Sequence, residues 1–161
     1  MMKVSMRLRG LEETLRAIGV GGTLWRHVMT HATQGMIENT EDLLGRAMRD
    51  APLDEGTLRG SGNAAVYIQG KAVARSGFAE VGDEAIGPEI RQIIEGGGGH
   101  NIVGVVGFNT PYALAQHERL DYQHPKGGKA KYLEDNLKEH ERQYQGNLDK
   151  HVAKALLRWH Y

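Results

Sequence analysis

The side chains best suited to chemistry form one short run rich in histidine and carboxylate groups. His117, Glu118, Asp121 and His124 offer the imidazole and carboxylate ligands that zinc and manganese accept. A helix presents two histidines on one face when they are four residues apart, but position 121 is an aspartate. His124 precedes Pro125 and is expected outside the helix. We therefore expect His117 and Glu118 to end a helix and to make hydrogen bonds. A metal-dependent or nucleic-acid-processing enzyme centred on His117, Glu118 and His124 is the alternative.

The sequence lacks the residues or the spacing of the other common catalytic motifs. The sequence has no cysteine nucleophile, and no serine lies in a Gly-x-Ser-x-Gly elbow. Gly128 and Lys129 are followed by Ala130, where a phosphate-binding loop needs serine or threonine. The sequence thus predicts no catalytic centre, no bound metal and no cofactor.

The length and composition favour a single domain, residues 1–161. They argue against a protein whose main ligand is a nucleic acid. Twenty basic and 20 acidic side chains cancel, whereas dedicated nucleic-acid binders carry a basic excess. The absence of cysteine is typical of a protein made in a reducing cytoplasm. We expect no signal peptide and no membrane association, because no stretch approaches the roughly 18 apolar residues of a membrane span.

One turn motif, Ala51-Pro-Leu-Asp-Glu-Gly-Thr-Leu-Arg-Gly-Ser61, separates a helical segment from an extended one. We expect Asp54 to accept hydrogen bonds from backbone N–H groups and Gly56 to supply an unusual backbone angle. Leu58 should enter the core, and Arg59 should point outwards. Asp54 and Arg59 are also candidates for charge contacts with a neighbouring subunit.

A second motif, Gly104-Val-Val-Gly-Phe-Asn-Thr-Pro-Tyr-Ala-Leu-Ala-Gln-His-Glu118, runs from an apolar strand through a turn into a short helix. Tyr112 follows Pro111 at the helix start. We expect its ring to anchor in the core while its hydroxyl group finds a polar partner.

The third motif is the local basic loop His124-Pro-Lys-Gly-Gly-Lys-Ala-Lys-Tyr-Leu-Glu134. Its default interpretation is a solvated loop, because surface charges usually contribute little. The sharper interpretation is contact with an acidic partner or with DNA phosphates, and the neutral chain favours a protein partner. Because the loop contains a proline and two glycines, we expect it to extend from the domain and to have little local structure. The candidate interface residues here are Tyr122, His124, Lys126, Lys129 and Lys131.

Hydrophobic periodicity predicts an α+β fold. The predicted sheet is antiparallel, with three to four strands, and two long helices pack on one of its faces. The predicted loops are rich in glycine. Residues 83–100 are expected to form an excursion at a sheet edge that contains one short helix beginning at Pro88. The expected strands are 3–9, 65–68, 73–81 and 101–108, with a turn at 69–71; the other expected helices are 11–18, 23–49 with Thr23 as N-cap, and 133–159.

In their order and spacing, the three motifs resemble the small tail-completion, or head–tail joining, proteins of long-tailed bacteriophages. Such proteins carry an A-P-x-D-x-G-x-L-R-x-S turn, a V-G-x-x-x-x-Y-A-x-x-x-E segment and a closing helix, and the resemblance covers residues 24–157. It implies a virion structural protein that forms a hexameric ring between tail and head and is made in the host cytoplasm. Its partners would be other neck, connector and tail proteins, with non-specific contact to traversing DNA. A tail terminator or another neck-ring component is the alternative within this class.

Overall fold

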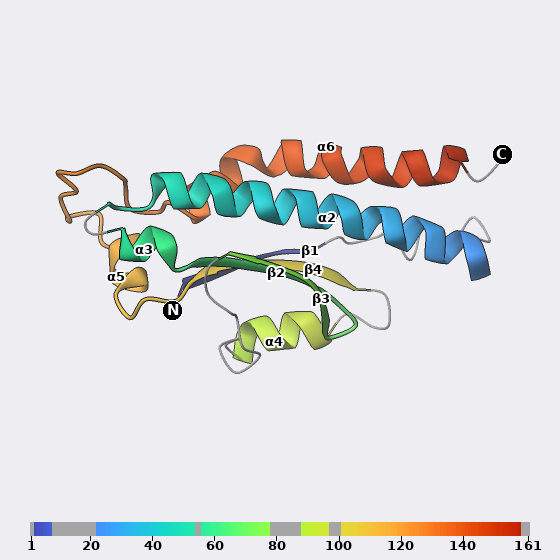
Figure 1. Cartoon of the computed structure of the whole chain (residues 1–161), viewed down its shortest axis with the longest axis horizontal. Helices are drawn as coiled ribbons and strands as arrows, with labels where there is room; N and C mark the ends of the chain where they lie inside the picture. The colour runs from blue at the N-terminus through green and yellow to red at the C-terminus, as the bar shows by residue number, and fades with distance from the viewer. Residues whose placement is uncertain (1, 8–21, 54–55, 78–87, 97–100, 159–161) are drawn as a thin grey trace.

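The computed structural model describes residues 2–7, 22–53, 56–77, 88–96 and 101–158 and has an α+β fold (Figure 1). The predicted helix at 11–18, Asp54 and most of the tetraglycine segment lie outside the described residues. The elements are β1 (Met2–Arg7), α2 (Gly22–Asp50), α3 (Thr57–Gly60), β2 (Gly62–Ile68), β3 (Lys71–Gly77), α4 (Pro88–Glu95), β4 (Ile102–Phe108), α5 (Ala113–Glu118) and α6 (Glu134–Arg158).

The four strands form one antiparallel sheet in the order β1-β4-β2-β3. All seven residues of β4 are buried, as expected for a β-branched strand with a neighbour on each side. Gln69 and Gly70 join β2 to β3 with positive φ angles of 52° and 79°. Two consecutive positive φ angles twist a two-residue turn to match the flanking strands, so the predicted hairpin is confirmed.

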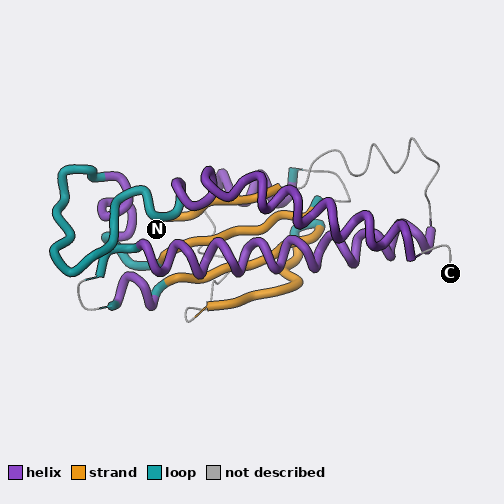
Figure 2. The backbone as a smooth tube through the Cα atoms, turned by 90° about the horizontal axis from the view of Figure 1, so that it is seen from above, coloured by secondary structure: helices purple, strands orange, loops and turns teal. Residues whose placement is uncertain are grey.

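The two long helices lie on the same face of the sheet, as predicted. Seen from above, α2 runs over the central strands and α6 runs beside it on the β1 side (Figure 2). A Cβ atom at Gly104 would lie 2.3 Å from the Thr40 hydroxyl oxygen, so glycine in β4 lets α2 approach the sheet closely. The helix begins at Gly22, which places Thr23 in the first turn rather than at the predicted N-cap.

The contact between α2 and α6 uses the predicted faces. Tyr144 and Leu148 are buried against α2, and Leu137 is half-buried beside them. The Asn39 side-chain amide donates to the Tyr144 carbonyl at 2.9 Å, and the Tyr144 hydroxyl donates to Asp42 at 3.1 Å. Polar pairs at defined positions within an apolar contact fix the register of the two helices.

The short helix α4 covers the opposite face of the sheet, so the predicted edge excursion is wrong (Figure 1). Ile94 is buried against side chains of β2 and β4 that point away from α2. Asn101 donates to the Ile93 carbonyl at 2.9 Å and accepts from Arg7 at 2.8 Å, which ties α4 to β1. The physical reason is that β4 has apolar side chains on both faces, so both faces need cover.

Candidate interaction site

The three sequence motifs meet at the end of the molecule where α2 terminates and where α3 and α5 lie (Figure 1). Backbone hydrogen bonds join them: Leu53 N–H to Gly127 O at 3.0 Å, Lys129 N–H to Asp50 O at 2.9 Å and Lys131 N–H to His117 O at 2.8 Å. Segments more than 60 residues apart therefore form one hydrogen-bonded unit. We call this unit the motif end; it comprises residues 50–53, 56–61 and 110–134.

Two residues of the turn motif have the backbone conformation or burial that the sequence predicts. Gly56 has a φ of 82°, in the left-handed region that favours glycine, and Leu58 is buried. Arg59 differs from the prediction. Its Nε atom donates to the Ala51 carbonyl at 2.8 Å and the residue is half-buried, so the guanidinium closes the turn instead of simply pointing outwards.

His117 is fully buried, and both of its ring nitrogens have partners. Its Nε2 accepts from the Glu134 backbone N–H at 3.3 Å, so the network assigns the proton to Nδ1, which donates to Glu118 at 2.7 Å. Neither nitrogen is left for a metal ion. His124 lies beyond the end of α5, and the Asp121 carboxylate pairs with Arg119 at 2.9 Å. Among the described residues, no three metal-binding side chains cluster.

Tyr132, rather than Tyr112, anchors the motif end in the core. Its fully buried ring packs edge-on against Phe108 and His117, each with centroids 5.0 Å apart, and its hydroxyl donates to the Ala113 carbonyl at 3.2 Å. Burial raises the pKa of Tyr132 above its ordinary value. Tyr112 is 43% exposed, so its predicted core position is wrong. The inward position at the start of α5 is occupied by Ala113, whose small side chain leaves room for the Tyr132 ring.

Lys129 and Lys131 of the basic loop form ion pairs within the chain. Lys129 lies 3.1 Å from Asp135, and Lys131 contacts both Glu118 and Glu134, the latter at 3.0 Å. The hydrogen bond from Lys131 lowers the pKa of Glu118, with a smaller contribution from His117. This pairing lowers the positive charge that Lys129 and Lys131 offer to an acidic partner or to DNA. The loop is also held by backbone hydrogen bonds, so the prediction of little local structure is wrong.

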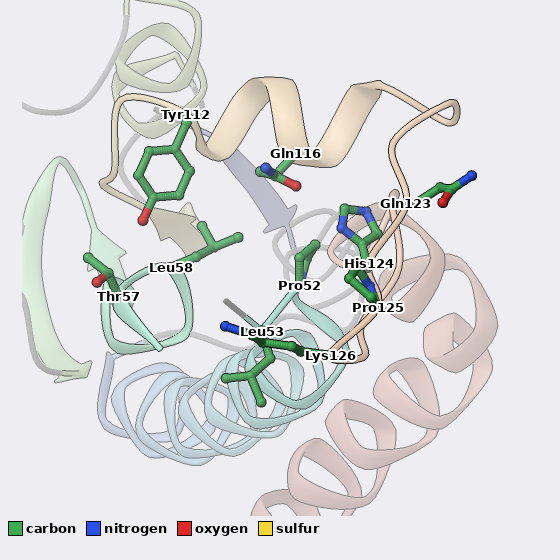
Figure 3. Close-up of a pocket in the computed structure, with 10 residues that line it drawn as sticks. All are labelled: Pro52, Leu53, Thr57, Leu58, Tyr112, Gln116, Gln123, His124, Pro125 and Lys126. Carbon is green, nitrogen blue, oxygen red and sulfur yellow. The ribbon is translucent and has the colours of Figure 1, made fainter. Parts of the chain in front are cut away.

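A pocket of about 590 Å³ opens at the motif end, between α3, α5 and the basic loop (Figure 3). Pro52 and Leu58 form apolar walls, and Gln116 and His124 face the same opening. The Gln116 Oε1 and His124 Nε2 atoms are buried and have no hydrogen-bond partner among the described residues. The remaining lining residues are Leu53, Thr57, Tyr112, Gln123, Pro125 and Lys126.

Exposed apolar side chains concentrate at the motif end, and two of them, Leu53 and Tyr112, line the pocket. Seven large apolar side chains are exposed in the described part of the chain, and five of them belong to the motif end. Tyrosine at such positions is typical of protein interfaces, because its ring gives contact area and its hydroxyl tolerates water. The five are Leu53, Tyr112, Leu114, Leu120 and Tyr122.

Of the predicted interface residues, the structure brings His124 and Lys126 to the pocket, whereas Tyr122 is exposed outside the pocket lining, with Arg119 stacked over its ring. Sequence reasoning missed Gln116 and Leu53, and it placed Tyr112 in the core. One signal was available for Gln116: it lies four residues after Tyr112, and residues four apart share a helix face. The position of Leu53 depends on how the turn folds back, which no local pattern encodes.

No protein-family model, curated protein or solved structure matches this chain. None of the helices that the structure describes is long and apolar enough to cross a membrane.

Proposed function

We propose that this protein is a structural component of a tailed-phage particle, a tail-completion or head–tail joining protein that acts in the neck. The sequence basis is the succession of three motifs described above. The observation that supports the proposal most is their meeting in space. Motifs that are separate in the sequence form one hydrogen-bonded end, and this end carries a pocket and most of the exposed large apolar side chains of the described residues.

The proposed mechanism is assembly rather than turnover. Copies of the chain would form a closed ring, for which the resemblance implies hexameric symmetry, and the motif end would face a neighbouring neck, connector or tail protein. Aromatic and apolar side chains suit such a contact because interface cores are depleted of charge. Contact with traversing DNA would be secondary, because Lys129 and Lys131 already pair with carboxylates.

Deletion of the gene in a phage-producing host tests the proposal. We expect filled heads and separate tails in electron micrographs, and joined particles again when a plasmid supplies the protein. Mass spectrometry of purified particles should then detect the chain at a few copies per virion. Normal infectious particles from the deletion strain would refute the proposed role.

A further inference from the structure

We propose that the pocket at the motif end binds an extended segment of a different polypeptide, whose apolar side chain packs against Pro52 and Leu58. The backbone of the same segment would hydrogen-bond to Gln116 and His124. The inference rests on the proposed function in one respect: it takes the segment to belong to a neighbouring virion protein. The binding chemistry follows from the pocket itself.

The unpaired polar atoms of the pocket favour a peptide backbone. Gln116 Oε1 accepts hydrogen bonds and cannot donate, whereas an imidazole Nε2 can do either, depending on its tautomer. Both atoms are buried without a partner in the described chain. An unpaired buried polar atom destabilises the structure, and an occupant that completes the hydrogen bond recovers that loss. An extended peptide presents N–H and C=O groups along one edge, so its backbone can offer a donor to one atom and an acceptor or donor to the other.

The apolar part of the pocket favours an inserted side chain. Pro52 and Leu58 lie on its walls, and Leu53 and Tyr112 extend the apolar surface to its exposed rim. Figure 3 shows Tyr112 at the start of α5 with its hydroxyl turned toward Thr57. A volume of about 590 Å³ lies in the range of about 300–1,000 Å³ that ligand pockets occupy. Apolar anchors that enter such pockets dominate the binding energy of many interfaces.

The charges near the pocket argue against a phosphate or carboxylate ligand. Two of the three lysines of the adjacent loop, Lys129 and Lys131, have carboxylate partners within the chain. Three of the polar lining side chains, Thr57, Gln116 and Gln123, carry no charge, and the lining lysine, Lys126, has a partner within the chain. A lining made mainly of apolar and uncharged polar side chains matches a polypeptide better than an anion, because anions need several donors with positive charge.

Photo-crosslinking in cells that produce particles tests the occupant. Replacing Tyr112 with p-benzoylphenylalanine puts a photoreactive group at the pocket rim, and the same replacement at Val73, which is exposed on β3, is the matched control. We expect the Tyr112 variant to crosslink to one segment of a different virion protein and to do so at least tenfold more than the Val73 variant. A crosslink only to a second copy of this chain, or equal yields at both positions, would overturn the proposal.

The variant Gln116→Met tests the hydrogen-bonding role separately. It removes the unpaired acceptor while keeping the side-chain length, so the isolated protein should keep or raise its melting temperature. Incorporation into particles should fall about tenfold, the effect of losing roughly 1.4 kcal/mol of binding. The control is Gln92→Met on the exposed surface of α4, which should be neutral in both assays. A lower melting temperature with unchanged incorporation per folded molecule would make Gln116 a structural residue and refute the inference.

The two proposals fail in different ways. If the chain is absent from purified particles but Tyr112 still crosslinks to a segment of another protein, the pocket inference stands and the neck function is wrong. If the chain is present in particles and Tyr112 gives no crosslink, the neck function stands and the pocket inference is wrong.

Discussion

Gly128 packs so closely against Pro52 that a Cβ atom at position 128 would lie 2.4 Å from the Pro52 Cα atom. Gly128 also has a φ of 96°, which side chains other than hydrogen rarely allow. The close contact lies where the basic loop crosses the turn after α2, next to the hydrogen bond between Lys129 N–H and Asp50 O. Two motifs about 70 residues apart are therefore joined through a position that requires glycine.

Substitution of the two loop glycines should give unequal losses of stability. Gly127 has a φ of 100°, but a Cβ atom there meets nothing within 4 Å. Gly127→Ala should therefore cost only the conformational strain of about 1–2 kcal/mol. Gly128→Ala adds a clash with backbone atoms of Pro52 and Ala51, and we expect a total of about 3–5 kcal/mol. Urea denaturation measures both values. Equal losses would mean that the loop moves away from the turn at little cost.

The contact between the long helices can be tested at Leu148. This side chain is 6% exposed and packs against Ala32 and Met36, so Leu148→Ala should lower the free energy of unfolding by about 2–5 kcal/mol. Leu157, on the same helix, is 72% exposed, and Leu157→Ala should stay within about 0.5 kcal/mol of the wild type. Similar losses for both variants in thermal or urea denaturation would contradict the packing of α6.

The elements with strong periodicity could be predicted from the sequence. The two long helices, the hairpin turn and the central strand follow from apolar spacing, Pro52 and β-branched residues, which are local signals. The side of the sheet that α4 covers could not be predicted. Ile90, Ile93 and Ile94 show that this helix has an apolar face, but they do not specify which surface that face meets.

The candidate site was predictable in its motifs but not in its side-chain partners. The sequence places three lysines in one loop. The carboxylate partners of Lys129 and Lys131 come from both neighbouring helices, through Glu118, Glu134 and Asp135. Similarly, Tyr112 and Tyr132 have the same chemistry and both lie near an expected helix start. Which ring is buried depends on tertiary packing: Tyr132 lies in the core with its hydroxyl on the Ala113 carbonyl, and Tyr112 lies at the surface.

Conservative substitution of these two tyrosines should separate their roles. Tyr132→Phe leaves the buried Ala113 carbonyl without its hydroxyl donor, so we expect a loss of about 1–2 kcal/mol in the free energy of unfolding. Tyr112→Phe changes a side chain that is half in solvent and should be neutral to within about 0.5 kcal/mol. Chemical denaturation of both variants checks the assignment. A larger loss for Tyr112→Phe would mean that the two rings have been assigned to the wrong environments.

The start of α6 should make stability depend on pH in the acid range. Hydrogen bonds from Lys138 and Lys131 lower the pKa of Glu134 from its ordinary value of 4.5 to about 2. A carboxyl whose pKa is lower in the folded state stabilises the fold above its unfolded pKa, and that stabilisation is lost as pH falls through the folded value. Wild type should thus be more stable than Glu134→Gln at pH 7. This difference in the free energy of unfolding should disappear as the pH falls from about 4.5 to 2.

Thermal denaturation across this pH range measures the effect of Glu134→Gln. High salt should reduce the difference, because the ion pairs are partly exposed to solvent. Glu141→Gln, at an exposed position on the same helix, is the matched control. A pH-independent difference between wild type and Glu134→Gln would show that the carboxylate does not act through its charge.

Hydrogen exchange in the free protein should reveal the ordered backbone of the basic loop. The amides of Lys129 and Lys131 donate to the carbonyls of Asp50 and His117, both of which lie outside the basic loop. Amides held in this way exchange only when the local structure opens, so we expect both to exchange at least about tenfold more slowly than the exposed loop residue Gln123. Gly128→Ala should remove this protection, since it forces the loop away from Pro52. Rapid exchange of Lys129 and Lys131 in the wild-type protein would show that the loop is ordered only after a partner binds.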